Sequence, residues 1–244
     1  MDSDAALAKA NFRLGLLLYA CAQFFVLTIA AMFLYPGGAK YHLAAERYLF
    51  LQNFFSDLGA TRTYSGKPNM LCASLFIVAL SFLGMAMIVA SQLWKAWVSR
   101  VPTEATQDGR APFSAPRNTS WGIAAQIFAA LSGLCYLGVA ATPWNYFLDA
   151  HNNLVKGAFS LLLGLIVCLL WGQIYERETT PYLIANCIYL ILLAAYVYLL
   201  FAGPSLQTQN GLAVQVAAQK IITYVSILNL AVQAVGRRRA LLFH

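Results

Sequence analysis

The sequence has 244 residues, of which 60% are hydrophobic and only 10% are charged. A soluble domain carries about 25% charged residues, and a soluble fold of this size could not bury so much apolar surface. The net charge is +7, but the basic residues are scattered or flank apolar runs, and no nucleic-acid-binding motif accompanies them. The composition therefore predicts a protein of the lipid bilayer, with membrane lipids and no nucleic acid among its partners.

Six apolar runs are long enough to cross a bilayer, because a hydrocarbon core of about 30 Å needs roughly 20 helical residues. They cover approximately residues 14–35, 71–94, 121–142, 154–175, 182–203 and 216–236. The first run exceeds the roughly 7–15 residues of a signal-peptide core, so we expect a retained span. Backbone groups in lipid must be paired, and no segment alternates like a membrane barrel strand. We therefore predict an all-α, six-helix transmembrane bundle that forms one domain over residues 1–244.

Basic residues near the span ends predict the orientation, because cytoplasmic loops carry the excess of Lys and Arg. The larger and closer set comprises Lys9, Arg13, Lys95, Arg100, Arg110, Arg117, Arg177, Arg237, Arg238 and Arg239. The other side of the bundle has Lys40, Arg47, Arg62, Lys67, Lys156 and Lys220. We expect the first side, with both termini, to be cytoplasmic. The terminal arginines anchor the last span and are suited to anionic headgroups.

The loops between the spans differ in character. Residues 95–120 are rich in Pro, Gly, Ser and Thr and predict a mobile cytoplasmic loop. The first outer loop runs from Pro36 to Asn69, and apolar residues around polar ones at positions 41–55 suggest an interfacial helix. The second outer loop is expected at Thr142–Asn153 and the third at Gly203–Gly211.

The first candidate site is Ser56-Asp57-Leu58-Gly59 in the first outer loop. An acidic side chain at a membrane surface, beside a flexible glycine, can bind a cation, take a proton or hold a headgroup amine or hydroxyl. Ser and Asp also cap backbone groups in ordinary turns. The sequence leaves both interpretations open.

The second candidate is Asp149 with His151, just before the fourth span. An Asp can orient a His, whose side chain titrates near neutral pH; alternatively Asp149 caps the helix. Lys156 and Lys220 lie about one turn into their spans, where each can snorkel to the interface or turn inward toward an acidic group. The candidate catalytic residues are Ser56, Asp57, Asp149 and His151. The candidate ligand-binding residues are Asp57, Asn69, Asp149, His151, Asn152, Lys156, Gln219 and Lys220.

The sequence offers few ligands for a metal site and no cysteine pattern typical of disulfides. The five cysteines lie in or beside apolar runs without a CxxC pair, which is typical of packing residues. The three histidines form no HxxxH or HExxH pattern, although one His with two Asp could still bind a metal. We therefore expect no metal site and no cofactor. Polar residues inside the spans predict interhelical hydrogen bonds at Gln23, Gln126, Asn186, Asn229 and Gln233. Close helix approach is expected at Gly133, Gly138, Gly157 and Gly164.

The Ser56–Gly59 motif, Pro68-Asn69, and His151 with Phe159 downstream resemble a group of uncharacterised prokaryotic six-span membrane proteins, known only as a domain of unknown function. The chain is more distantly similar to the Frag1/DRAM/Sfk1 membrane proteins, whose eukaryotic members are tied to lipid-anchor remodelling and membrane lipid biology. The likeness implies a six-helix bundle with a polar outer-face site, in a bacterial inner (plasma) membrane. A looser similarity to ceramidase-related zinc hydrolases is limited by the small number of histidines.

These features lead to one preferred hypothesis and two alternatives. We favour a non-enzymatic membrane protein that binds a lipid headgroup or small polar ligand at the outer mouth of the bundle. The first alternative is an intramembrane lipid hydrolase or transferase, with His151 as base, Asp149 or Asp57 as its orienter, and Ser56 as nucleophile. The second is a small transporter, which is disfavoured because the spans lack Gly/Pro interruptions and midplane charges.

Overall fold

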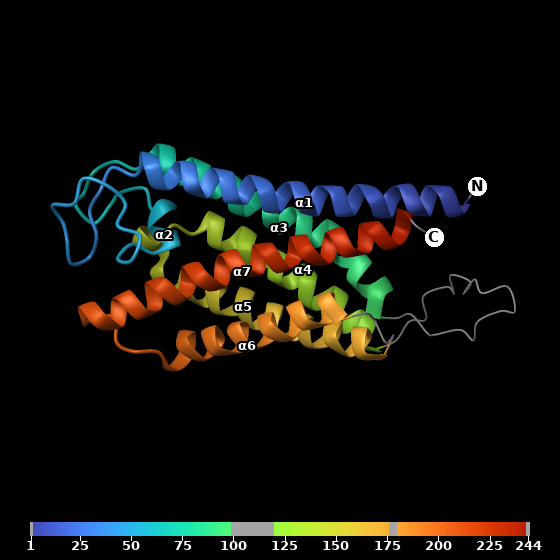
Figure 1. Cartoon of the computed structure of the whole chain (residues 1–244). Helices are drawn as coiled ribbons and strands as arrows, with labels where there is room; N and C mark the ends of the chain where they lie inside the picture. Colours follow the sequence, from blue (N-terminus) through green and yellow to red (C-terminus); the bar gives the residue numbers. More distant parts are fainter. Residues whose placement is uncertain (1, 99–119, 176–179, 243–244) are drawn as a thin grey trace, which may run out of the picture.

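The computed structural model describes residues 2–98, 120–175 and 180–242, and within them every regular element is a helix (Figure 1). The helices are α1 (Asp2–Leu34), α2 (Phe55–Leu58), α3 (Met70–Val98), α4 (Ser120–Ala141), α5 (Trp144–Tyr175), α6 (Thr180–Ala202) and α7 (Gln209–Leu242). Most of the predicted cytoplasmic loop, at residues 99–119, lies outside the described residues.

The predicted six-span, all-α bundle is confirmed. All the helices except α2 contain a stretch long and apolar enough to cross a membrane, 6 in total among the described residues. The longest helices also extend beyond the predicted runs. The 33 residues of α1 span about 50 Å at a rise of about 1.5 Å per residue, well beyond a hydrocarbon core of about 30 Å.

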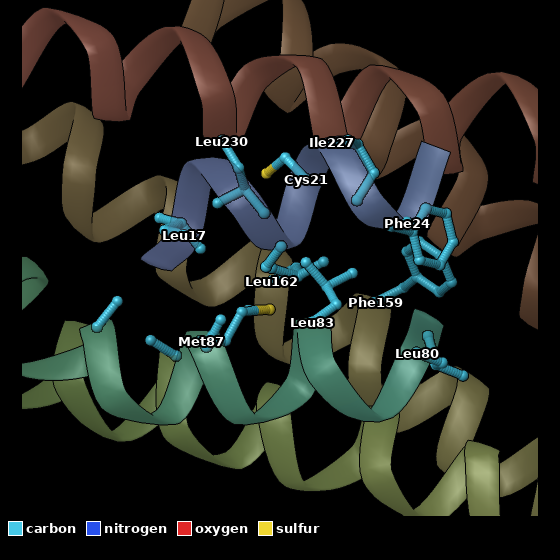
Figure 2. Close-up of a cluster of buried hydrophobic side chains, with 14 of the residues drawn as sticks. Leu17, Cys21, Phe24, Leu80, Leu83, Met87, Phe159, Leu162, Ile227 and Leu230 are labelled. Atoms are coloured by element: carbon cyan, nitrogen blue, oxygen red, sulfur yellow. The ribbon is translucent and has the colours of Figure 1, made fainter. Parts of the chain in front are cut away.

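The long helices form a closed ring in which α7 returns to α1. Packing follows chain order from α3 through α4, α5 and α6 to α7, while α1 contacts both α3 and α7. The start of α1 and the end of α7 lie at one end of the bundle, and the loops around α2 lie at the other (Figure 1). Apolar side chains from α1, α3, α5 and α7 meet in the centre, including Phe24, Leu83, Phe159 and Leu230 (Figure 2).

Glycines let neighbouring helices approach closely, as predicted for α4 and α5. A Cβ added at Gly84 in α3 would lie 2.7 Å from the Gly133 carbonyl oxygen, and one added at Gly133 would lie 2.6 Å from the Gly84 carbonyl oxygen. On α5, a Cβ added at Gly164 would meet the Phe128 ring at 2.9 Å. Because backbone atoms cannot move aside like a flexible side chain, the α3–α4 contact requires glycine on both helices.

The predicted interfacial helix at residues 41–55 is wrong. Residues 41–54 form turns and an isolated bridge at His42, and the only helix nearby is α2, which has 4 residues. Local side chains take the backbone hydrogen bonds that a helix would need: Asn53 Oδ1 accepts from the Leu49 N–H at 3.0 Å. The Tyr48 hydroxyl donates to the Asn53 carbonyl oxygen at 3.0 Å. Such bonds compete with helix formation.

The predicted loop at Thr142–Asn153 is also largely wrong, because α5 already begins at Trp144. The chain turns at Pro143, whose carbonyl oxygen accepts bonds from the N–H groups of Tyr146 and Phe147 at 3.0 Å each. Phe147 then leaves helical geometry, with φ −131° and ψ 52°, and marks a kink. Asp149 and His151 are therefore helical residues, one turn beyond this kink.

The α3–α4 contact gives a stability prediction. We expect Gly84→Ala to lower the free energy of unfolding by about 1–3 kcal/mol, because the new methyl group overlaps backbone atoms. Gly15→Ala in α1 is the matched control, since nothing lies within 4 Å of its added Cβ. It should be neutral or slightly stabilising. Thermal unfolding in detergent, followed by size-exclusion chromatography, measures both. Equal stability of the two variants would contradict the proposed role of the contact.

Candidate functional site

Residues 35–69, which join α1 to α3 and include α2, form a structure that we call the cap. The cap is attached to several other parts of the chain. The Phe55 N–H donates to Gln219 Oε1 on α7 at 2.9 Å. The Thr61 N–H donates to Asn145 Oδ1 on α5 at 3.1 Å. The Lys40 ammonium donates to the Leu206 carbonyl oxygen, in the α6–α7 connection, at 2.9 Å. The cap thus covers the end of the bundle opposite the termini (Figure 1).

Asp57 and Asn53 form the buried polar centre of the cap. Asp57 is 1% exposed, and its Oδ2 accepts hydrogen bonds from Asn53 Nδ2 at 3.0 Å and from the Phe54 N–H at 2.9 Å. Asn53 Nδ2 also donates to the Gly38 carbonyl oxygen at 3.0 Å. An acidic side chain that accepts the N–H at a helix start stabilises that start. The Asp57 side chain therefore organises the cap from within.

Asn69 serves the same structure from the other side of α2. Its Nδ2 donates to the carbonyl oxygens of Asp57, Leu58 and Ala60, at 3.3, 3.1 and 2.8 Å. Asn69 is 2% exposed, so it cannot offer this group to an external ligand without breaking the turn. The Asn69 amide nitrogen is thus taken by the protein's own backbone, whereas its Oδ1 is buried without a hydrogen-bond partner.

Lys220 enters the cap from α7 and turns inward. It is 1% exposed, and its ammonium group donates to the Asn53 carbonyl oxygen. The same ammonium lies 5.3 Å from the centre of the Tyr48 ring and 5.0 Å from that of Phe50, with Phe55 at 5.8 Å. Aromatic faces attract a cation most strongly where water is excluded. Of the two orientations open from sequence, the structure shows inward burial.

Burial sets the protonation of Asp57. Loss of water raises the pKa of its carboxyl group to about 7, against the opposing effects of the bonds from Asn53 and Phe54 and of the Lys220 charge. The Trp144 indole also faces the carboxyl group and lowers its pKa, although its N–H does not reach hydrogen-bond geometry. The cap therefore holds an acid that titrates near neutral pH.

A cavity lies beneath α2, inside the bundle. Its volume, taken as the space that the centre of a water molecule can occupy, is about 50 Å³. This is enough for a few waters or for one end of a larger molecule. Its apolar wall includes Phe24, Leu80, Leu83, Phe159, Ile227 and Leu230, all labelled in Figure 2. Its polar lining comprises Ser56, Tyr136, His151, Gln219, Thr223 and Ser226.

Within this lining, His151 is the residue whose side chain has a buried hydrogen-bonding atom without a partner in the protein. It is 4% exposed, and its Nδ1 lies 2.7 Å from the Thr142 carbonyl oxygen. A carbonyl oxygen can only accept, so Nδ1 carries the proton and Nε2 of the neutral ring is an acceptor. Nε2 is buried and has no hydrogen-bond partner in the protein. A buried acceptor without a partner is destabilising by about 1–3 kcal/mol.

The structure brings together only part of the residues predicted for the site. Asp57, Asn69, Gln219 and Lys220 meet in the cap, and Ser56, His151 and Gln219 line the cavity. Asp149 and Asn152 are exposed. Lys156 lies 5.3 Å from the Phe201 ring on α6. Among the described residues, no group of three or more His, Cys, Asp or Glu side chains could hold a metal.

Sequence reasoning missed the remaining polar lining of the cavity. Thr223 and Ser226 follow Gln219 at spacings of four and three, which places all of them on one helix face. That spacing was visible in the sequence. Tyr136 of the cavity lining and Asn145, which binds Thr61 of the cap, had no comparable signal, because their roles depend on how α4 and α5 pack in the bundle.

The raised pKa of Asp57 gives a pH prediction. Its folded pKa of about 7 lies above the ordinary 3.8, so the protonated acid stabilises the closed cap at low pH and this contribution is lost as pH rises through about 7. We expect hydrogen–deuterium exchange in residues 53–69, corrected for intrinsic rates, to show less protection at about pH 8 than at about pH 6. The difference is at most about 1.4 kcal/mol per pH unit.

Asp57→Asn is the matched variant for this measurement, since an amide oxygen can still accept both bonds but does not titrate. It should remove most of the pH dependence while the cap stays folded. An unchanged pH profile in Asp57→Asn would assign the effect to another group.

Comparison with known proteins identifies a family. The model of the UNC-50 family matches residues 49–236, a range that contains Asn53, Asp57, His151 and most of α7. No curated protein and no solved structure matches the chain. The match covers more than half of the sequence and all six apolar helices except α1, and the family is one of membrane proteins. The chain therefore belongs to the UNC-50 family and is an integral membrane protein.

Proposed function

We propose that the protein binds an amphipathic molecule, such as a lipid, with the molecule's polar end at His151 and its apolar part inside the bundle. The observation that carries this proposal is the buried, unpartnered Nε2 of His151 on the lining of an otherwise largely apolar cavity. Ligand pockets commonly combine apolar walls with a few placed polar groups.

The polar end of the ligand must be a hydrogen-bond donor. Nε2 of His151 is an acceptor, because Nδ1 is engaged by the Thr142 carbonyl oxygen. A hydroxyl, amine or amide N–H would therefore satisfy it. Ser56 and Gln219 also line the cavity and offer further polar contacts. This chemistry fits the polar end of a lipid with a free hydroxyl or amine.

The apolar part of the ligand would lie against aromatic rings and leucines. Phe159 meets the Tyr136 ring edge-to-face, with ring centres 6.2 Å apart, and Phe24 lies 6.3 Å from Phe55. Burying each CH₂ group in such a lining contributes about 0.8 kcal/mol. The size of the cavity, about 50 Å³, suits one chain end or a small amphipathic molecule more than a complete bilayer lipid.

This proposal moves the ligand from the exposed outer face to the space beneath the cap. The expected headgroup ligands Asp57 and Asn69 hold the cap together, and Asp149 and Asn152 are exposed on α5. Cytoplasmic termini, a bacterial inner membrane and anionic lipid near Arg237, Arg238 and Arg239 remain proposals, which the basic residues and the sequence resemblance support.

Native mass spectrometry of gently extracted protein tests the proposal. We expect a small lipid or amphipathic molecule on the wild type, and an occupancy lowered about ten-fold or more in His151→Phe, which keeps the ring but removes the acceptor. Asp149→Asn, two residues away and exposed, is the matched control and should retain the molecule. Equal retention by all three proteins, or a wild type without a bound molecule, would contradict the proposed site.

An intramembrane hydrolase is the second candidate, because Ser56 and His151 line the same cavity. The tautomer of His151 also suits a general base. Its orienting group is the Thr142 carbonyl oxygen rather than an acid: Asp57 binds Asn53 and Phe54, and Asp149 is exposed. A Ser-His pair with a carbonyl orienter is the arrangement that this candidate requires.

Labelling with a fluorophosphonate probe separates the two candidates. We expect the wild-type protein to remain unlabelled, because no acid orients His151 and the proposed role is binding. Ser65→Ala, in the cap, is the matched control for Ser56→Ala. Labelling that persists in Ser65→Ala but disappears in Ser56→Ala would show that Ser56 is a nucleophile, and it would favour the hydrolase over the binding protein.

A further inference from the structure

One face of α7 is polar along most of its length. Its residues recur at spacings of three, four and seven, so that they lie on one side of the helix, with Asn229 beside them. They are Gln219, Thr223, Ser226, Gln233 and Arg237. All of them lie within the apolar stretch that could cross a membrane. Polar side chains inside a membrane are rare and mark either helix contacts or pathways for polar molecules.

The half of this face nearer the cap lines the cavity. Gln219, Thr223 and Ser226 are all part of the cavity lining. Ser226 also accepts a hydrogen bond from the Tyr189 hydroxyl of α6 at 2.8 Å, and it is 3% exposed. The polar side of the cavity thus continues along α7 toward the contact with α6.

The other half of this face continues as a chain of side-chain amides. Asn229 Nδ2 donates to Asn186 Oδ1 at 2.9 Å, and Asn186 Nδ2 donates to Gln173 Oε1 at 2.7 Å. Gln173 Nε2 donates to Gln233 Oε1 at 3.1 Å, and Gln233 Nε2 donates to the Tyr182 carbonyl oxygen at 3.2 Å. These four amide side chains are at most 6% exposed. They link α5, α6 and α7 and confirm the predicted interhelical bonds of Asn186, Asn229 and Gln233.

Helix contact alone leaves two acceptors unexplained. His151 Nε2, at the cavity, and Asn229 Oδ1, in the amide chain, are both buried without a hydrogen-bond partner. Lipid chains cannot donate to them, and buried polar groups of this kind are ordinarily satisfied by water or a ligand. His151 Nε2, on α5, lies at the cavity end of the polar face and Asn229 Oδ1 lies in the amide chain, so water or a polar solute can pair with an acceptor at both levels of the bundle.

We propose that the polar face of α7 lines a hydrated pathway from the cavity toward the C-terminal end of α7, and that it takes small, uncharged, hydrogen-bonding solutes. Between Lys220 and Arg237 the polar groups of this face are neutral amides and hydroxyls, which offer donors and acceptors but no counter-charge for an ion. The chain of amides is the narrow part, where a solute exchanges hydrogen bonds with the side chains. The outer end of this pathway is the cavity assigned to the ligand above, and in this respect the inference rests on the proposed function.

Cysteine accessibility tests the pathway in proteoliposomes that hold the full-length protein. The probe is 2-hydroxyethyl methanethiosulfonate, a small uncharged reagent that can hydrogen-bond and that reacts with thiolates, which form in water rather than in lipid. We expect Ser226→Cys and Asn229→Cys to react about ten-fold faster or more than Leu228→Cys, whose position is 64% exposed on the outer surface of the bundle. Ile222→Cys, at an apolar position that is 1% exposed, is the buried control.

The outcomes separate a pathway from a static contact. The native cysteines set the background, which labelling of the wild-type protein measures. Reaction of Ser226→Cys and Asn229→Cys no faster than the two controls would overturn the pathway. If Ser226→Cys fails to fold, Thr223→Cys, which also lines the cavity, replaces it; if Asn229→Cys fails to fold, Gln233→Cys, in the same amide chain, replaces it. If the wild-type protein carries no ligand in native mass spectra but Ser226→Cys and Asn229→Cys are labelled fast, the bound lipid is rejected and the pathway is kept. If the wild type carries the ligand but the two variants are labelled slowly, the pathway is rejected and the bound lipid is kept.

Discussion

The hydrogen bond from the Lys220 ammonium to the Asn53 carbonyl oxygen connects the last helix to the cap. A buried ammonium is stable only where it has partners, and here the partners are a backbone carbonyl, three aromatic rings and the nearby Asp57 charge. The same constraint acts on the cap, whose Asp57 and Asn53 satisfy each other and the surrounding backbone. The position of α7 and the conformation of residues 35–69 therefore depend on one another.

This dependence explains why a cavity exists below α2. The cap places Phe55 and Ser56 over the bundle, while Gln219, next to Lys220 on α7, accepts the Phe55 N–H. On the opposite side, α3 and α4 are drawn together by backbone contact at Gly84 and Gly133. The space between these two regions is lined by rings and leucines, and His151 of α5 turns its imidazole toward it.

The described polar groups fall into two kinds. In the cap, Asn53, Asp57 and the Asn69 amide nitrogen are engaged by internal partners and hold the fold. Along the cavity and α7, His151 and Asn229 each retain an acceptor without a protein partner. Gln52 Oε1 and Asn69 Oδ1 in the cap are also buried without a partner, but His151 Nε2 is the better indicator of a ligand, because it lies on a cavity that can hold one. The UNC-50 family match spans both kinds of residue.

The sequence by itself determined that the protein lies in a lipid bilayer, that its fold is all-α and how many helices cross the membrane. Six apolar runs of sufficient length leave helices as the solution in lipid, and the structure has these helices at nearly the predicted positions. Amide side chains within the spans also predicted their interhelical bonds, because an amide in lipid needs a partner wherever that partner lies.

Only the tertiary structure decided which polar residues share a site. Asp149 and His151 are two residues apart in sequence, yet one is exposed and the other is buried, because the helix places them on different faces. Conversely, Asn53 and Lys220 are 167 residues apart and share one hydrogen bond. The local pattern also did not show that residues 41–54 form turns instead of a helix, because the side-chain bonds of Tyr48 and Asn53 that replace helical bonds are seen only in the folded cap. A membrane span can be predicted from its own residues, because its requirement is burial of apolar side chains in lipid. A site cannot, because it is formed by segments that are far apart in the sequence.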